Sequence, residues 1–147
     1  MTEPQEGTGH TTAVPFLGAL AIIVAIVIGI WLFNAFSDPT PNDGEQIADA
    51  VAGQNDALQR GDYADFRGFT CGPQAGTEAQ FAARQHDSVA KRGQRFVDGV
   101  SNVKVDGDRA TGSVTYHFDS APGAKQTVDV GFAREGGAWK VCSTGPS

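Results

Sequence analysis

Two cysteines are the residues of this chain whose chemistry is easiest to specify. They are Cys71 and Cys142, far apart in the sequence, and the chain holds no others. Two cysteines in one domain are what a single disulfide requires, and disulfides persist in oxidising compartments. Without clustered histidines the pair cannot complete a four-ligand zinc site, and neither cysteine belongs to a redox C-x-x-C motif. We expect a Cys71–Cys142 disulfide, with two buried thiols as the alternative.

The other reactive side chains form no recognisable catalytic motif in the sequence. There is no Ser-His-Asp arrangement, no phosphate-binding loop and no cluster of metal ligands. The formal net charge of −6 and the scattered basic residues give no support to a nucleic-acid partner, which would favour a basic stripe. We therefore expect no metal, no cofactor and no nucleic acid.

A long apolar run precedes all of these residues. The segment from Val14 to Phe33 has 20 residues and no charged side chain. A helix of that length is about 30 Å long, which is the thickness of a bilayer core. The sequence predicts a transmembrane helix over residues 14–36, preceded by a short tail over residues 1–13. A cleaved signal peptide and a buried helix of a soluble core are the alternatives.

Charge does not orient this helix, because neither flank carries lysine or arginine close to it. The expected disulfide decides instead, since cytoplasmic thiols stay reduced. We expect a single-pass protein of the cell membrane with a cytoplasmic N-terminus, in contact with the lipid bilayer. After a linker over residues 37–44, residues 45–147 should form an extracytoplasmic domain.

Three helices are expected at the start of this domain, over residues 45–60, 62–69 and 77–92. Gly61 ends the first helix, and Asp62 can cap the second. Thr77-x-x-Gln80 is a capping box that opens the third helix. Phe81 and Val89 should pack this third helix against the core.

A period of two then replaces the helical period, which indicates β-strands. Strands are expected around residues 100–105, 110–118, 127–132 and 138–142. Turns are expected at Asp106-Gly107 and over residues 120–124. The buried sheet face should carry Val114, Tyr116, Phe118, Val128, Val130 and Phe132. Helices followed by an antiparallel meander give an α+β fold, with the helices covering one face of a curved sheet.

This order of elements resembles the nuclear transport factor two-like (NTF2-like) superfamily, a cone-shaped α+β fold. More narrowly, it is similar to membrane-anchored extracytoplasmic members of actinobacteria. The matching segments are Gly61-Asp62-Tyr63, Cys71-Gly72, Val103 to Thr111 and Trp139 to Cys142. The resemblance covers about residues 45–142. It implies a fold rather than a function, since most of that group has no assigned chemistry.

Enzymes of this superfamily use Asp, His or Tyr side chains inside the cone, where burial shifts their pKa values. The candidates here are Tyr63, Tyr116, His86, His117, Asp119 and Asp129. Each has a plainer interpretation: the neighbours His86 and Asp87 share no helical face, and His117 alternates out of phase with the apolar face. We expect no catalytic residue. The residues that could line a pocket are Tyr63, Tyr116, Phe118 and Phe132.

Three functions fit these observations. The first is a non-enzymatic accessory protein of the cell envelope, bound to a larger integral membrane complex such as a respiratory or lipid-transport assembly. The second is a binding module for a lipid or a small apolar ligand. The third is an enzyme of the isomerase or dehydratase kind. The presence of a cavity, and the side chains that line it, would discriminate between them.

Overall fold

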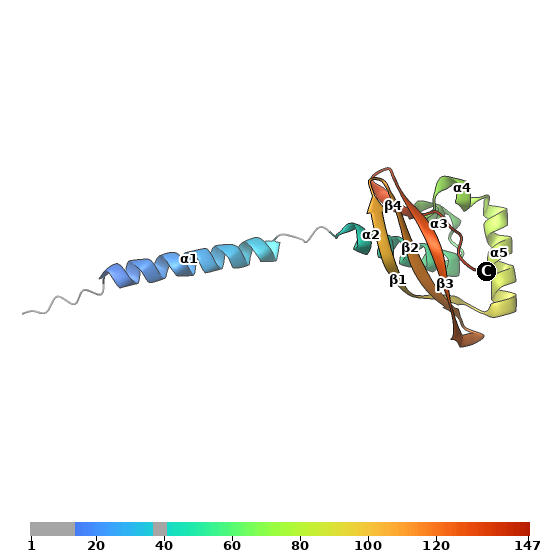
Figure 1. Cartoon of the computed structure of the whole chain (residues 1–147), viewed down its shortest axis with the longest axis horizontal. Coiled ribbons are helices and arrows are strands. Elements are labelled where there is room, and N and C mark those ends of the chain that lie inside the picture. Colours follow the sequence, from blue (N-terminus) through green and yellow to red (C-terminus); the bar gives the residue numbers. More distant parts are fainter. Residues whose placement is uncertain (1–13, 37–40) are drawn as a thin grey trace, which may run out of the picture. The chain divides into compact units, whose positions relative to one another are not determined.

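The computed structural model describes residues 14–36 and 41–147 of the chain, and the surroundings of side chains from residue 20 to 32 in the first of these segments (Figure 1). The chain divides into two compact units, Met1–Thr40 and Pro41–Ser147. The predicted tail over residues 1–13 lies outside the described residues, as does the linker from residue 37 to 40.

The first unit contains one described helix, α1 (Val14–Phe36), which is apolar on every side. Its large apolar side chains between Leu20 and Leu32 are 40–67 % exposed. Among the residues whose surroundings are described, no helix combines the length and the hydropathy that a membrane crossing requires.

Within residues 41–147, four helices precede the sheet. They are α2 (Asp43–Arg60), α3 (Tyr63–Phe69), α4 (Gly72–Ala75) and α5 (Glu78–Arg92). The α2 helix begins two residues before the predicted start, so the predicted linker was too long. The reason is a capping box in which Asn42 Oδ1 accepts a hydrogen bond from the Glu45 amide and the Glu45 carboxylate accepts one from the Asn42 amide.

The predicted end of the first helix and the predicted start of the third are confirmed, and two other predictions are corrected. Gly61 has a left-handed conformation (φ 70°) and ends α2, and Thr77 with Gln80 caps α5. The short α4 had been expected to be a loop. Val89 was predicted to face the core but is 42 % exposed, and Ser88 is buried instead. Ser88 lies seven residues after the buried Phe81, two full turns along the same helical face, whereas Val89 lies well to one side.

The four strands form one antiparallel sheet in the order β1-β2-β3-β4. Their bounds are β1 (Arg95–Asp106), β2 (Arg109–Phe118), β3 (Ala121–Glu135) and β4 (Ala138–Val141). The α2 helix packs against β1 and β4, and α3 packs against α2 and β4. In Figure 1 α2 crosses behind the strands. The predicted α+β fold, with helices packed on an antiparallel meander, is confirmed.

Two predicted turns are shifted. The β1–β2 loop is Gly107-Asp108, because Asp106 already pairs with Arg109. The turn predicted over residues 120–124 is shorter, and β3 begins at Ala121. Phe118 pairs with Ala121 while Tyr116 pairs with Gln126, so the extra residues of β3 are accommodated as a bulge inside the strand.

The core lies between α2 and the inner face of the sheet. It contains Ile47, Ala50, Val51, Ala110, Val114, Tyr116, Val130, Phe132, Trp139 and Val141. Val128 is half-buried against this group. A second group joins Ala57 of α2, Phe66 of α3 and Phe81 of α5. Each large side chain buried in this way contributes roughly 1.5–3 kcal/mol, so the sheet and α2 are the main source of stability.

Candidate functional site

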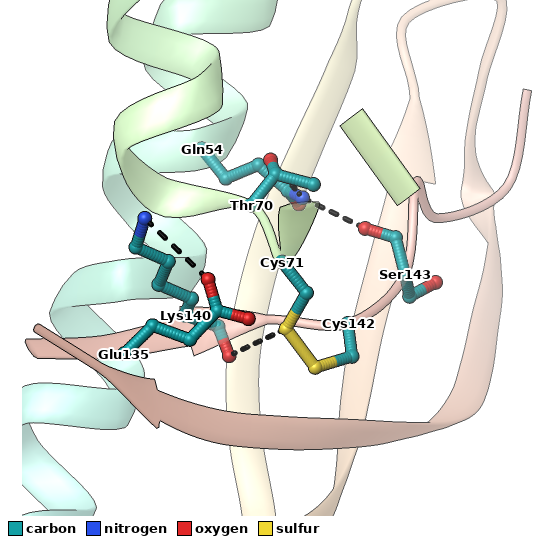
Figure 2. The surroundings of a disulfide bond; sticks show 7 residues. All are labelled: Gln54, Thr70, Cys71, Glu135, Lys140, Cys142 and Ser143. Carbon is teal, nitrogen blue, oxygen red and sulfur yellow. Dashed lines mark hydrogen bonds and ion pairs between the residues drawn. A yellow bond between two sulfur atoms is a disulfide. The ribbon is translucent and has the colours of Figure 1, made fainter. Parts of the chain in front are cut away.

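The two cysteines form a disulfide, as the sequence predicted. Cys71 and Cys142 are 71 residues apart in sequence, and their Cα atoms are 4.8 Å apart. Cys71 lies between α3 and α4, and Cys142 directly follows β4. Figure 2 shows the bond joining the end of the last strand to the helical layer.

Backbone hydrogen bonds flank this disulfide on both sides. Thr70 pairs in parallel with Val141, and the Cys71 amide donates to the Val141 carbonyl oxygen at 2.9 Å. The Cys142 amide donates to the Gly131 carbonyl oxygen at 2.8 Å. The β4 strand is therefore covered at one edge by β3 and at the other by residues 70–71, and the disulfide fixes the start of the chain that follows.

The next residues, Ser143–Ser147, are called the C-terminal segment below. A buried glutamine of α2 connects this segment to the disulfide region. Gln54 Nε2 donates to Thr70 Oγ1 at 3.0 Å and to the Ser143 carbonyl oxygen at 2.7 Å (Figure 2). One side chain thus holds α2, the residue before Cys71 and the residue after Cys142 together.

Arg95, the first residue of β1, lies beneath the C-terminal segment and is only 2 % exposed. Its Nη1 donates to the carbonyl oxygens of Thr144 at 2.9 Å and Pro146 at 3.2 Å. Its Nε donates to Asn55 Oδ1 at 2.9 Å. The guanidinium carbon lies 4.8 Å from the centre of the Tyr116 ring, a cation–π geometry. The C-terminal segment therefore supplies Arg95 with neutral oxygen acceptors.

The electrostatics of this pair follow from burial. Desolvation lowers the pKa of Arg95, and the Tyr116 side chain partly opposes that shift. Desolvation also raises the pKa of Tyr116, which keeps its hydroxyl protonated, while Arg95 opposes this. Arg95 forms no ion pair with an Asp or Glu among residues 41–147. Arg95 Nη2 and Tyr116 Oη are buried without a hydrogen-bond partner in the same part of the chain.

A cavity of about 20 Å³ lies beside Arg95. Its walls come from α2, α3, α5, the start of β1 and the C-terminal segment. The charged side chains in its lining are those of Arg84 and Arg95, and no Asp or Glu side chain of the described chain contributes to it. A cavity of this size holds about one water molecule or a group of similar size. The site can therefore accept a small electron-rich group.

The residues predicted to line a pocket do not surround this cavity. Tyr116, Phe118 and Phe132 are buried in the domain interior. Tyr63 is half-buried on α3, and its hydroxyl donates to the Gly76 carbonyl oxygen. Of the four, Tyr116 alone is in contact with the buried guanidinium of Arg95.

His117 lies on the outer face of the sheet, as its alternation predicted, but it is not freely solvated. Its Nδ1 is 2.9 Å from Asp98 Oδ1, and both side chains are 23 % exposed. Its ring stacks on Phe96 with centroids 5.0 Å apart. The hydrogen bond with His117 is the main cause that lowers the pKa of Asp98.

The other predicted acid–base candidates lie apart from one another. His86 and Asp87 are exposed on α5, with Nδ1 and Oδ1 3.8 Å apart. Asp129 accepts a hydrogen bond from Ser113 Oγ at 2.9 Å on the outer sheet face. Asp119 lies in the β2–β3 turn. The structure does not bring these residues into one site.

Arg95 was not among the predicted site residues, because its strand was expected to begin near residue 100. The alternation itself contained the signal. Arg95 pairs with Phe118 and Val97 pairs with Tyr116, both on the buried face of β2. Extending the inward positions of β1 back from Val97 by two residues would have placed Arg95 inside the domain.

No family model and no curated protein matches the chain. Several solved structures are similar to the chain, including the three that follow. One is a candidate dehydratase of the NTF2-like family from Streptomyces avermitilis, with 20 % identity, a TM-score of 0.48, and coverage of 69 % of this chain and 91 % of that one. Another is a candidate NTF2-like transpeptidase from Campylobacter jejuni, with 15 % identity, a TM-score of 0.43, and coverage of 64 % and 95 %.

The third is an uncharacterised cystatin-fold protein from Novosphingobium aromaticivorans. It shares 9 % identity with a TM-score of 0.42, and the match covers 65 % of this chain and 94 % of that one. Two of the three are named NTF2-like, the superfamily that the sequence resembles.

Proposed function

We propose that this protein is a membrane-anchored accessory protein of the cell envelope, whose disulfide-bonded domain works outside the cytoplasm next to a larger integral membrane complex. The observation that carries the proposal is the presence, in one chain, of an uncharged apolar helix and a domain closed by its only two cysteines.

The α1 helix supports the anchor. It lies in a run of sequence without a charged side chain, and it has no polar face to present to water. A helix that is hydrophobic all round needs apolar surroundings, either inside a large protein core or in a bilayer. In this proposal the bilayer provides them, and residues 1–13 stay in the cytoplasm.

The Cys71–Cys142 bond supports the placement of the domain outside the cytoplasm. Cytoplasmic glutathione and thioredoxin keep most thiols reduced, so a structural disulfide favours an extracytoplasmic domain. The bond closes a loop of 71 residues, and in the chain-entropy model such a link contributes about 4 kcal/mol. A domain of this size gains a large share of its net stability from such a link.

The outer face of the sheet supports a protein partner. Within residues 41–147 the helices cover the other face, and the outer face exposes Phe96, which pairs with His117 and is 42 % accessible. Exposed apolar side chains on a rigid sheet suit a docking surface when they are surrounded by polar groups. Here the polar neighbours include Ser113, Thr115 and Thr127.

Site-specific photo-crosslinking in native membranes tests this proposal. A photoreactive phenylalanine derivative at Phe96 or at Thr127, which is exposed on the same outer face, should give one discrete cross-linked product, the same from both sites. The same group at His86, exposed on α5, is the matched control and should give no such product. Two results would contradict the proposal: equal cross-linking from His86, or release of the protein from membranes by alkaline carbonate.

A further inference from the structure

Within residues 41–147 no Asp or Glu side chain neutralises the buried guanidinium of Arg95, and this observation is independent of where the protein resides. A charged group that is buried without an opposite charge is costly unless hydrogen bonds or a bound ion compensate it. The C-terminal segment provides two carbonyl oxygens to Nη1 alone. Nη2 and the neighbouring Tyr116 hydroxyl remain as buried donors without an acceptor in residues 41–147.

We propose that Arg95 and Tyr116 form a binding site for a small carboxylate, and that the C-terminal segment is a displaceable cover over this site. The inference goes beyond the proposed function and does not depend on the membrane anchor. The bound carboxylate would accept hydrogen bonds from Arg95 and Tyr116, and it would take the place of the Thr144 and Pro146 carbonyl oxygens.

The charge of the lining selects an anion. Arg84 and Arg95 both border the cavity, and no acidic side chain of the described residues does. Arginine remains protonated at physiological pH even when burial lowers its pKa, so the site keeps a positive charge. A water molecule could accept one of the free hydrogen bonds but could not neutralise this charge.

The geometry favours a carboxylate among small anions. A guanidinium presents planar N–H donors that match two oxygen atoms, and Tyr116 adds a further donor beside it. The two carbonyl oxygens already on Nη1 show that the site accepts a pair of oxygens. The cavity of about 20 Å³ limits the part of a ligand that fits beneath the closed segment to its head group.

Gly145 explains how the cover fits so closely. Its φ of 70° is in the left-handed region, which favours glycine. A Cβ atom at this position would clash with Arg95 Nη1 and would lie 3.4 Å from Tyr116 Oη. Any larger residue must therefore move either the segment or the guanidinium, and both shifts separate the two, which makes Gly145 a means of opening the site.

The test is a titration of the isotope-labelled full chain in non-ionic detergent, followed through the backbone amide resonances of Thr144 and Ser147. Sodium acetate is the probe, and acetamide is the neutral control of the same shape. Acetate should shift both resonances saturably, and acetamide should not. The Arg95→Met variant should bind acetate at least about tenfold more weakly, because it loses a charge-assisted hydrogen bond. Tyr116→Phe should weaken binding about fivefold.

The Gly145→Ala variant should bind acetate more tightly than the natural chain, because it raises the population with Arg95 uncovered. Gly136→Ala is its matched control. Gly136 also has a left-handed φ of 62°, but a Cβ there meets no atom within 4 Å. The control should therefore leave the acetate affinity unchanged.

Four results would overturn the proposal. They are no saturable shift with acetate, an equal shift with acetamide, saturation by chloride that acetate cannot reverse, and unchanged affinity in Arg95→Met. If Arg95→Met does not fold, the acetate–acetamide comparison and the Gly145→Ala and Gly136→Ala pair still decide the outcome.

Discussion

The last ten residues of the chain contain two halves that are held in different ways. The first half, Ala138–Cys142, is secured by the β3–β4 ladder, by the bridge to Thr70 and by a covalent bond to Cys71. The second half, Ser143–Ser147, is held in part by side chains that donate to its carbonyl oxygens, from Gln54, Arg95 and Arg92. In Figure 1 the chain end lies beside α5.

This difference distinguishes contacts that hold the fold together from contacts that a ligand could replace. Backbone pairing and a disulfide cannot be exchanged for a ligand without unfolding that part of the sheet. Hydrogen bonds from a charged side chain to neutral carbonyl oxygens can be exchanged, because an anion is a better acceptor for the same donors. The disulfide thus places the C-terminal segment, and the segment in turn covers Arg95.

Removal of the disulfide should have the largest effect on stability. The Cys71→Ala/Cys142→Ala variant should lose about 4 kcal/mol of unfolding free energy, since its unfolded chain regains the entropy of an open 71-residue loop. Urea unfolding followed by tryptophan fluorescence measures the loss. Reduction of the natural chain should give the same midpoint, and a loss below about 1 kcal/mol would show that the first half does not depend on the bond.

Substitution of Gln54, the residue that contacts both halves, should rank second. Gln54→Ala should cost about 2–3 kcal/mol, because it empties a buried position and removes the hydrogen bonds to Thr70 and Ser143. Equilibrium urea unfolding measures this cost. Asp56→Ala, exposed on the same helix, should change stability little. A comparable loss in both variants would contradict a specific role for Gln54.

Loss of the Asp43 contacts should destabilise the first half alone, and by less than the Gln54 substitution. Asp43 Oδ1 accepts hydrogen bonds from Arg134 Nη2 and from Trp139 Nε1 of β4. Because these groups are partly solvated, Asp43→Ala should cost about 1 kcal/mol. Asp49→Ala, exposed on the same helix, is the control. The amide shifts of the C-terminal segment should stay unchanged, and their movement would show that the two halves are coupled.

The Asp98–His117 contact, remote from both halves, should have the smallest effect and a defined pH dependence. The hydrogen bond with His117 holds the pKa of Asp98 below its ordinary value of 3.8. Since the folded pKa lies below the unfolded one, this contact stabilises the fold above pH 3.8 and loses its contribution as the pH falls further. Urea midpoints across this acidic range should therefore fall less steeply in Asp98→Asn. An identical slope would contradict the assignment.

Local structure was easier to predict from the sequence than the contacts that Arg95 makes. Gly61, the Thr77–Gln80 box and the alternation of β2 each act within a few residues, so their signals are visible in a short window. The Cys71–Cys142 pair was predictable because two cysteines allow one intramolecular pairing. The cover over Arg95 was not, since Arg95 and Thr144 meet across 49 positions and an arginine is ordinarily assigned to the surface.

The misplaced boundaries have similar physical reasons. The start of α2 depends on Asn42, whose polar side chain is equally suited to a linker. The start of β3 was hidden by Pro122 and Gly123, which usually mark a turn but here lie in a bulged strand. The Asn42–Glu45 capping box decided the first case, and pairing with β2 decided the second.

The most direct test of the central claim is the oxidation state of the two cysteines in the native membrane. Cells are quenched with acid, free thiols are alkylated, and the protein is digested without reduction and analysed by mass spectrometry. We predict that peptides containing Cys71 and Cys142 are recovered joined to each other. The contradicting result is recovery of the two peptides separately, each with an alkylated cysteine. The same sample must contain a known periplasmic or secreted protein that keeps its disulfides.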